Sequence, residues 1–173
     1  FVQKTKYFDI IYSSASENTA ALISEHADNY AEEISQKLNR KIPKRMPIYI
    51  EGGREILNGY YTFFPYRRIV LFDTLPEEGQ LSNLSDIILK VLYHELTHAI
   101  SLTYFLPLLP MSFTEGVAVS YESAEDDQGR LNDPLIMHHL MQGRLENASP
   151  SWKQAAGARD VYPGGLWPYI YGG

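Results

Sequence analysis

Two histidines and a glutamate within five consecutive residues are the part of this sequence best suited to chemistry. His94, Glu95 and His98 stand in the order H-E-x-x-H. In an α-helix, positions four apart share one face a single turn apart, so both imidazoles could bind one metal ion. Glu95 is rotated by about 100° from His94 at that helical pitch and could reach a metal-bound water without being a ligand. The spacing predicts a metal site with a general base beside it.

The alternative is that both histidines belong to the hydrophobic core and hydrogen-bond to the backbone. About one shuffled sequence in a hundred with this composition would contain the pattern, so chance alone does not dismiss it. Burying two imidazoles and a carboxylate without partners on an apolar helix is costly, which weighs against the alternative. The chain has no cysteine, so only His, Asp or Glu could hold a metal, and thiol catalysis is excluded.

A second motif follows on a separate predicted helix. The segment from Thr114 to Glu122 reads T-E-G-V-A-V-S-Y-E. It resembles the N-E-G-x-A-x-x-x-E motif of gluzincin metallopeptidases, including the thermolysin-like and aminopeptidase N-like groups, with Thr114 in place of the common asparagine. In that family the glutamate of the second helix is the third zinc ligand. The resemblance implies one Zn²⁺ per chain, held by His94, His98 and Glu115, with the open coordination position of a catalytic zinc.

The same resemblance extends to a segment upstream and to a residue downstream of these ligands. Asn58 to Phe63 is similar to the edge strand that lines the cleft in bacterial peptidase-MA-like proteins and pairs with the extended substrate. The implied substrate-binding residues are Gly59, Tyr60, Tyr61, Thr62 and Phe63. An aromatic edge of the core is the alternative. Glu122, two turns beyond Glu115, could orient a ligating imidazole or be an ordinary exposed glutamate.

The group that would stabilise the oxyanion is left open among four residues. Tyr169-Ile170-Tyr171-Gly172 resembles the Y-x-x-G segment of aminopeptidase N-like enzymes, in which a tyrosine hydroxyl has this role. Tyr169 matches that tyrosine, and Tyr171 competes with it. His138 and His139 are alternatives by residue type alone.

Apolar periodicity and turn residues predict the elements that position these residues. Apolar residues at three- and four-residue steps indicate an amphipathic helix over Asn18–Asn39, entered through Ser14 and Glu17 at capping-box spacing. Ser85-Asp86 is expected to cap the helix that carries the histidines, and Ser112 or Thr114 the next one. The remaining predictions are strands at Lys6–Tyr12 and Met46–Glu51, two strand pieces within Gly59–Phe72 broken by Pro65, and a helix opening at Asp133-Pro134.

These elements and the resemblance imply one α+β domain with a zincin-like fold. We expect a small twisted mixed sheet packed on the N-terminal helix and the zinc helix, in an upper lobe of about residues 1–104. A mostly helical C-terminal lobe of about residues 105–173 would follow. At 173 residues the chain suits one domain or two lobes, and both of its ends resemble cuts from a longer sequence.

Charge and hydropathy limit the kinds of partner that the chain could bind. A formal net charge of −6 with only one short basic run, Lys37 to Arg45, argues against nucleic acid. No apolar run is long enough to span a bilayer. The family resemblance implies a peptide or protein substrate, and we expect a monomer. The absent cysteines, the missing initial methionine and the resemblance to secreted bacterial relatives favour an extracytoplasmic location.

The implied reaction is peptide-bond hydrolysis by a zinc-activated water, with Glu95 as general base. No segment resembles the amine-anchoring G-A-M-E-N of aminopeptidases, which favours an endopeptidase. Two other functions remain open. The chain could be a zinc-containing binding or scaffold module of a larger surface or periplasmic protein, or a hydrolase of non-peptide amides or esters.

Overall fold

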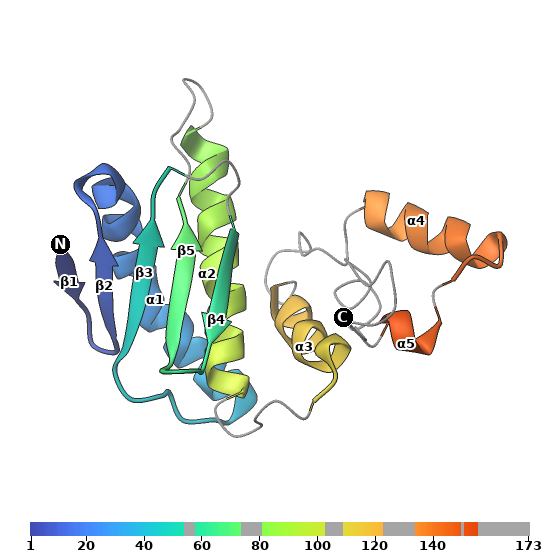
Figure 1. The fold of residues 1–173 in the computed structure, drawn as a ribbon, viewed down its shortest axis with the longest axis horizontal. Helices are drawn as coiled ribbons and strands as arrows, with labels where there is room; N and C mark the ends of the chain where they lie inside the picture. The colour runs from blue at the N-terminus through green and yellow to red at the C-terminus, as the bar shows by residue number, and fades with distance from the viewer. Residues whose placement is uncertain (54–57, 74–80, 103–108, 123–133, 150, 156–173) are drawn as a thin grey trace. The chain divides into compact units, whose positions relative to one another are not determined.

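The computed structural model describes residues 1–53, 58–73, 81–102, 109–122, 134–149 and 151–155, with residues 81–84 described by their backbone alone. The chain divides into two compact units, Phe1–Thr103 and Tyr104–Gly173. The fold is mixed α+β, as expected. The first unit contains a five-stranded sheet with two long helices, and the described elements of the second unit are all helices (Figure 1).

The sheet is mixed, with strand order β1-β2-β3-β5-β4. Three strands, β2, β3 and β5, run parallel, and the outer strands β1 and β4 run antiparallel to their neighbours. The predicted strand Met46–Glu51 is confirmed, and Pro65 lies between two strands as expected. The short first strand was not predicted. The bounds are β1 Val2–Lys4, β2 Phe8–Tyr12, β3 Met46–Glu51, β4 Asn58–Thr62 and β5 Arg68–Phe72.

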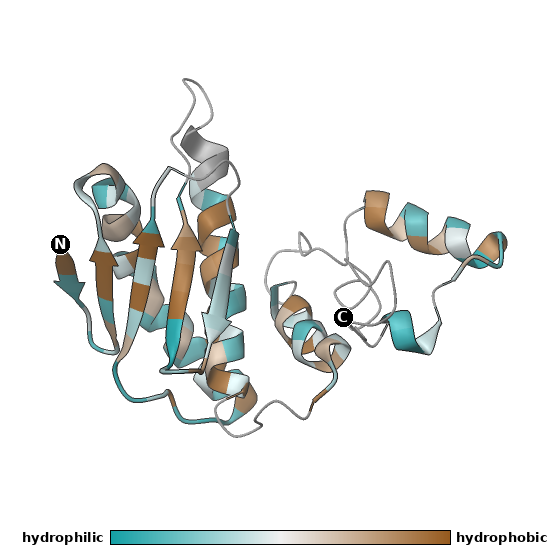
Figure 2. Cartoon of the chain, viewed as in Figure 1, coloured by the Kyte–Doolittle hydropathy of each residue, from teal (hydrophilic) through white to brown (hydrophobic). Residues whose placement is uncertain are grey.

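One face of the sheet is buried and carries both long helices. Along β3, buried and half-buried residues alternate, as a strand with one covered face requires. Helix α1 (Glu17–Leu38) packs on β2, and helix α2 (Leu81–Ser101) packs on β4 and β5 and against α1. Figure 2 shows apolar residues concentrated on β2, β3 and β5. The core of this unit therefore lies between the sheet and the α1–α2 pair.

Two predicted helix starts are corrected. The capping box at Ser14 and Glu17 does not form, because Ser14–Ser16 make a 3-10 turn and no side-chain cap is present at the start of α1. Helix α2 begins at Leu81 and not at Ser85-Asp86. In the sequence, Leu81 and Leu84 continue the apolar three- and four-residue steps of this helix, which outweigh the capping signal.

The second unit contributes helices α3 (Met111–Glu122), α4 (Pro134–Leu145) and α5 (Trp152–Ala155). Helix α3 begins before both predicted caps, and the Thr114 hydroxyl donates to the Met111 carbonyl oxygen, 3.0 Å away. Proline opens α4 as predicted. No helix among the described ranges is long and apolar enough to cross a membrane.

Candidate metal centre

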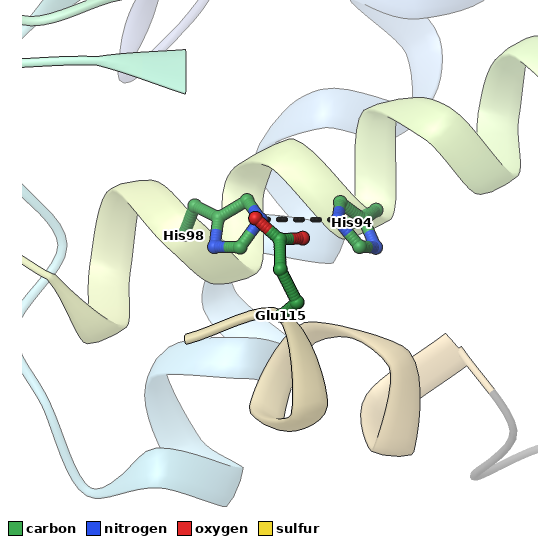
Figure 3. Close-up of side chains that lie close together, drawn as sticks. All are labelled: His94, His98 and Glu115. Carbon is green, nitrogen blue, oxygen red and sulfur yellow. Dashed lines mark hydrogen bonds between the residues drawn. The ribbon is translucent and has the colours of Figure 1, made fainter. Parts of the chain in front are cut away.

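Helix α2 brings the two predicted histidine ligands together. The Nε2 atoms of His94 and His98 lie 3.0 Å apart, and the rings are nearly perpendicular, with centroids 4.6 Å apart (Figure 3). Each residue is only 6% exposed. When both rings are neutral, one Nε2 donates a hydrogen bond and the other accepts it. When both Nε2 atoms are unprotonated, their lone pairs could instead bind one cation.

The remaining residues of the motif are buried on the same helix. Glu95 is as buried as the histidines, which is unusual for a carboxylate that has no local role. Thr97 is fully buried, and its hydroxyl donates to the Tyr93 carbonyl oxygen, 2.9 Å away. The Thr97 hydroxyl thus has its hydrogen-bond partner within the helix.

A polar network between the two long helices fixes α2 next to the histidine pair. The Tyr93 hydroxyl donates to Oε1 of Glu33 on α1, 2.6 Å away, and Lys37 pairs with the same carboxylate. Tyr30 of α1 meets the Tyr93 ring edge-on, with centroids 5.2 Å apart. Because Tyr93 directly precedes His94, this anchor limits rotation of the helix and so the direction in which His94 points.

Glu115 of α3 joins the two histidines. One ligand atom from each of His94, His98 and Glu115 lies within 4.8 Å of the others, and Figure 3 shows the carboxylate directed at the histidine pair. The histidines are buried and Glu115 is half-buried. This group of three could bind a metal ion.

The donor set and spacing fit a transition metal. Two nitrogens at 2.0–2.1 Å from a tetrahedral ion stand about 3.3 Å apart, so the observed 3.0 Å needs only a small adjustment. Imidazole with carboxylate suits zinc, and two histidines with one carboxylate also suit iron(II). The donors alone are compatible with a transition metal and do not identify the ion.

The predicted substrate-binding segment forms β4, at one edge of the described sheet, against α2. A Cβ on Gly59 would lie 2.8 Å from Cγ1 of Val91 and 2.9 Å from Cδ2 of Leu71. Only glycine allows the strand to lie this close to the helix, one turn before His94. Phe63 lies just beyond the strand, in the turn to β5.

Strand β4 has two notable polar features, which are the direction of its backbone groups and the buried Tyr61 hydroxyl. The Gly59 N–H bonds to the Asn58 side-chain oxygen, 2.9 Å away, so it points away from β5. By the alternation of an antiparallel ladder, the N–H and C=O of Tyr61 face the same open edge. The Tyr61 hydroxyl oxygen is buried and has no hydrogen-bond partner among the described residues. Burial raises the pKa of Tyr61, so its hydroxyl keeps its proton at neutral pH.

Among the described residues, the group that could hold a metal consists of His94, His98 and Glu115, without the other predicted site residues. Glu122 lies half-buried at the end of α3. His138 and His139 are exposed on α4, and their ring centroids are 6.2 Å apart. Tyr169 and Tyr171 lie outside the described residues. The oxyanion-stabilising group thus stays a prediction.

Sequence reasoning missed the anchor formed by Tyr93 and Glu33. The pair of Glu33 and Lys37 has the four-residue spacing of a helical ion pair and is visible in the sequence. Tyr93 comes sixty residues after Glu33, so only the packing of α1 on α2 reveals their hydrogen bond. Near the motif itself, the sequence signal for this anchor was the tyrosine directly before His94.

Comparisons with known proteins supply a relative but no family. A protein of Treponema pallidum (strain Nichols) described as uncharacterized is 48% identical over 176 residues. The match covers the whole of this chain and 17% of that protein's length, so the chain corresponds to a small part of a much longer protein. No family model matches the sequence, and no solved structure matches the chain.

Proposed function

We propose that this chain is a zinc-dependent hydrolase of peptide bonds, of the gluzincin type and with a zincin-like arrangement of its sheet and helices. The observation that carries the proposal is the buried pair of Nε2 atoms, 3.0 Å apart, with Glu115 completing the group. The T-E-G-x-A-x-x-x-E segment that contains Glu115 adds the family resemblance.

The family resemblance favours zinc over iron(II), and the buried Glu95 favours hydrolysis over simple binding. His94, His98 and Glu115 would hold the ion, and the zinc would supply Lewis acidity toward a carbonyl group and a bound water. A carboxylate next to the ligands on the same helix can take a proton from a nucleophilic water and deliver it to a leaving amine. A site that only binds a partner has no evident need for a carboxylate at this position.

Strand β4 supplies a way to hold an extended substrate. The Tyr61 backbone donor and acceptor at the open edge can pair with one residue of a peptide, as strand addition requires. The Tyr61 hydroxyl is buried under this strand and has no hydrogen-bond partner among the described residues. Binding through backbone groups favours a peptide over a simple ester, since an ester lacks the N–H that would meet the Tyr61 carbonyl oxygen.

Metal content tests this proposal first. The full chain is purified without added metal and measured by elemental mass spectrometry, beside Glu115→Ala and Glu122→Ala. We expect about one zinc per chain, lost in Glu115→Ala and retained in Glu122→Ala. One iron per chain, or no metal after zinc is supplied, would overturn the zinc assignment.

Profiling with a peptide library tests hydrolysis and separates the alternatives. Zinc-loaded protein is incubated with the library, and the products are read by mass spectrometry. Cleavage at internal bonds, abolished in Glu95→Gln, is the expected result and indicates an endopeptidase. Zinc binding with no cleavage would favour a binding module. Turnover restricted to ester or non-peptide amide substrates would place the chain among other hydrolases.

A further inference from the structure

The fold gathers basic residues at one end of the first unit. Strands β2, β3 and β5 are parallel and in register, so the chain segments that precede them lie at the same end of the sheet (Figure 1). The end of α1 and the turn from β4 to β5 lie there too. We call this the basic end. It holds nine of the chain's fifteen lysines and arginines: Lys4, Lys6, Lys37, Arg40, Lys41, Lys44, Arg45, Arg67 and Arg68.

Asp9, Asp28, Glu32 and Glu33 lie at the basic end, and they are fewer than its nine basic residues. Lys6 pairs with Glu32, Lys37 with Glu33, and Arg45 with Asp9. Lys41 and Lys44 are exposed and form no ion pair with any described residue. The described acidic residues at the opposite end of the sheet, where the parallel strands finish, are Glu17, Glu51, Asp73 and Asp86. Although the whole chain is acidic, the first unit therefore carries its positive charge at one end.

An apolar turn projects from the basic end. Phe63 is 41% exposed and Phe64 is 77% exposed, in the turn between Thr62 and Arg68, which are paired across β4 and β5. Pro65 is exposed beside them. Two adjacent phenylalanines exposed to solvent are unusual in a surface turn, because exposure of an apolar ring to water is unfavourable.

Tyrosine and arginine follow the phenylalanines in the same turn. The Arg68 guanidinium lies over the Tyr66 ring, 5.0 Å from its centroid. This contact restrains the end of the turn beside β5, which reduces the entropy lost when the turn meets another surface. The turn thus combines two exposed phenylalanines with a tyrosine and two arginines.

We propose that the basic end docks on an anionic phospholipid bilayer, with Phe63 and Phe64 inserted among the acyl chains. These residue types are the ones that a bilayer surface accommodates: phenylalanine at the acyl boundary, tyrosine at the interface, and lysine or arginine at the phosphates. Each basic side chain near an anionic surface favours binding by about fivefold. Phosphate contacts with a nucleic acid would use the basic residues but give no role to the two exposed phenylalanines, whereas a bilayer uses both. This docking does not depend on the proposed hydrolysis.

Vesicle flotation with the full chain tests the proposal. We expect flotation with phosphatidylcholine vesicles containing a quarter phosphatidylglycerol, and little with phosphatidylcholine alone. High salt weakens the binding by screening the charges. The double variant Phe63→Ser, Phe64→Ser lowers partitioning about tenfold or more through lost apolar burial. The double variant Lys41→Gln, Lys44→Gln lowers it by about twentyfold through lost charge.

Matched variants elsewhere control for general changes. Phe1→Ser removes an exposed phenylalanine beside Tyr12, at the opposite end of β2, and Lys90→Gln removes an exposed lysine in the middle of α2; both variants retain binding. Circular dichroism checks that each variant is folded. In Phe64→Trp, tryptophan emission shifts to shorter wavelength with anionic vesicles, whereas Phe1→Trp shows no shift. Absence of flotation, equal flotation of the double phenylalanine variant, or selective binding of a labelled oligonucleotide in place of vesicles would each overturn the proposal.

Discussion

The chain contains two pairs of neighbouring histidines, which differ in spacing, burial and contact. His94 and His98 are one helical turn apart, buried, and joined through their Nε2 atoms. His138 and His139 are adjacent in sequence, exposed, and their ring centroids are 6.2 Å apart. Consecutive residues on a helix point about 100° apart, so the second pair does not converge on one ion. Spacing and burial, and not residue type, make the first pair a candidate site.

Removing one histidine from each pair gives the largest contrast. We expect His98→Ala to reduce bound metal from about one per chain to near zero, because two ligands hold zinc far more weakly than three. His139→Ala should leave the metal content unchanged. Elemental mass spectrometry after dialysis measures both. Equal loss in the two variants would show that the exposed pair contributes to the site.

Changing the carboxylates tests which residue acts on the reacting groups. Glu95→Gln keeps the size and burial of the side chain but removes the base, so we expect turnover to fall by about a hundredfold to ten-thousandfold with zinc retained. Glu122→Gln should change turnover far less. Initial rates on a cleaved library peptide, with metal content measured in parallel, provide the readout. Near-normal hydrolysis by Glu95→Gln would refute its role as the base.

Gly59, which lies against the buried helix α2, and Gly143, which lies on the exposed helix α4, extend the comparison to packing. Gly59→Ala places a methyl group 2.8 Å from Val91, so we expect a loss of about 1–3 kcal/mol in the free energy of unfolding. Gly143, on α4, has nothing closer than 4.0 Å, and Gly143→Ala should be neutral or stabilise by up to about 1 kcal/mol. Urea unfolding followed by circular dichroism measures both. An equal response would mean that β4 is not packed tightly on α2.

The smallest expected effect concerns the anchor behind His94. Tyr93→Phe removes the hydrogen bond to Glu33 and should cost about 1 kcal/mol of unfolding free energy. It should also weaken zinc binding, since α2 loses a restraint beside a ligand. Tyr7→Phe removes a comparable bond to Glu32, but that carboxylate is 41% exposed and keeps Lys6, so a smaller loss is expected. Zinc affinity should respond to Tyr93→Phe alone.

Local sequence predicted much of the fold. The helix predicted over Asn18–Asn39 appears as Glu17–Leu38, and Met46–Glu51 matches at both ends, because strong periodicity is a local property. The capping signals failed at Ser14, Ser85 and Ser112. A cap contributes about 1 kcal/mol, and the apolar stripe that packs a helix on its neighbours contributes more.

The sequence by itself determined the spacing of His94, Glu95 and His98, because a helix places residues four apart on one face whatever surrounds it. It could not show that Tyr93 bonds to Glu33, or that Gly59 lies against Val91, since those contacts depend on how separate elements pack. The basic end is the clearest case. The run from Lys37 to Arg45 is only a helix exit in the sequence, and parallel strand pairing is what brings Lys4 and Arg67 to the same end of the sheet.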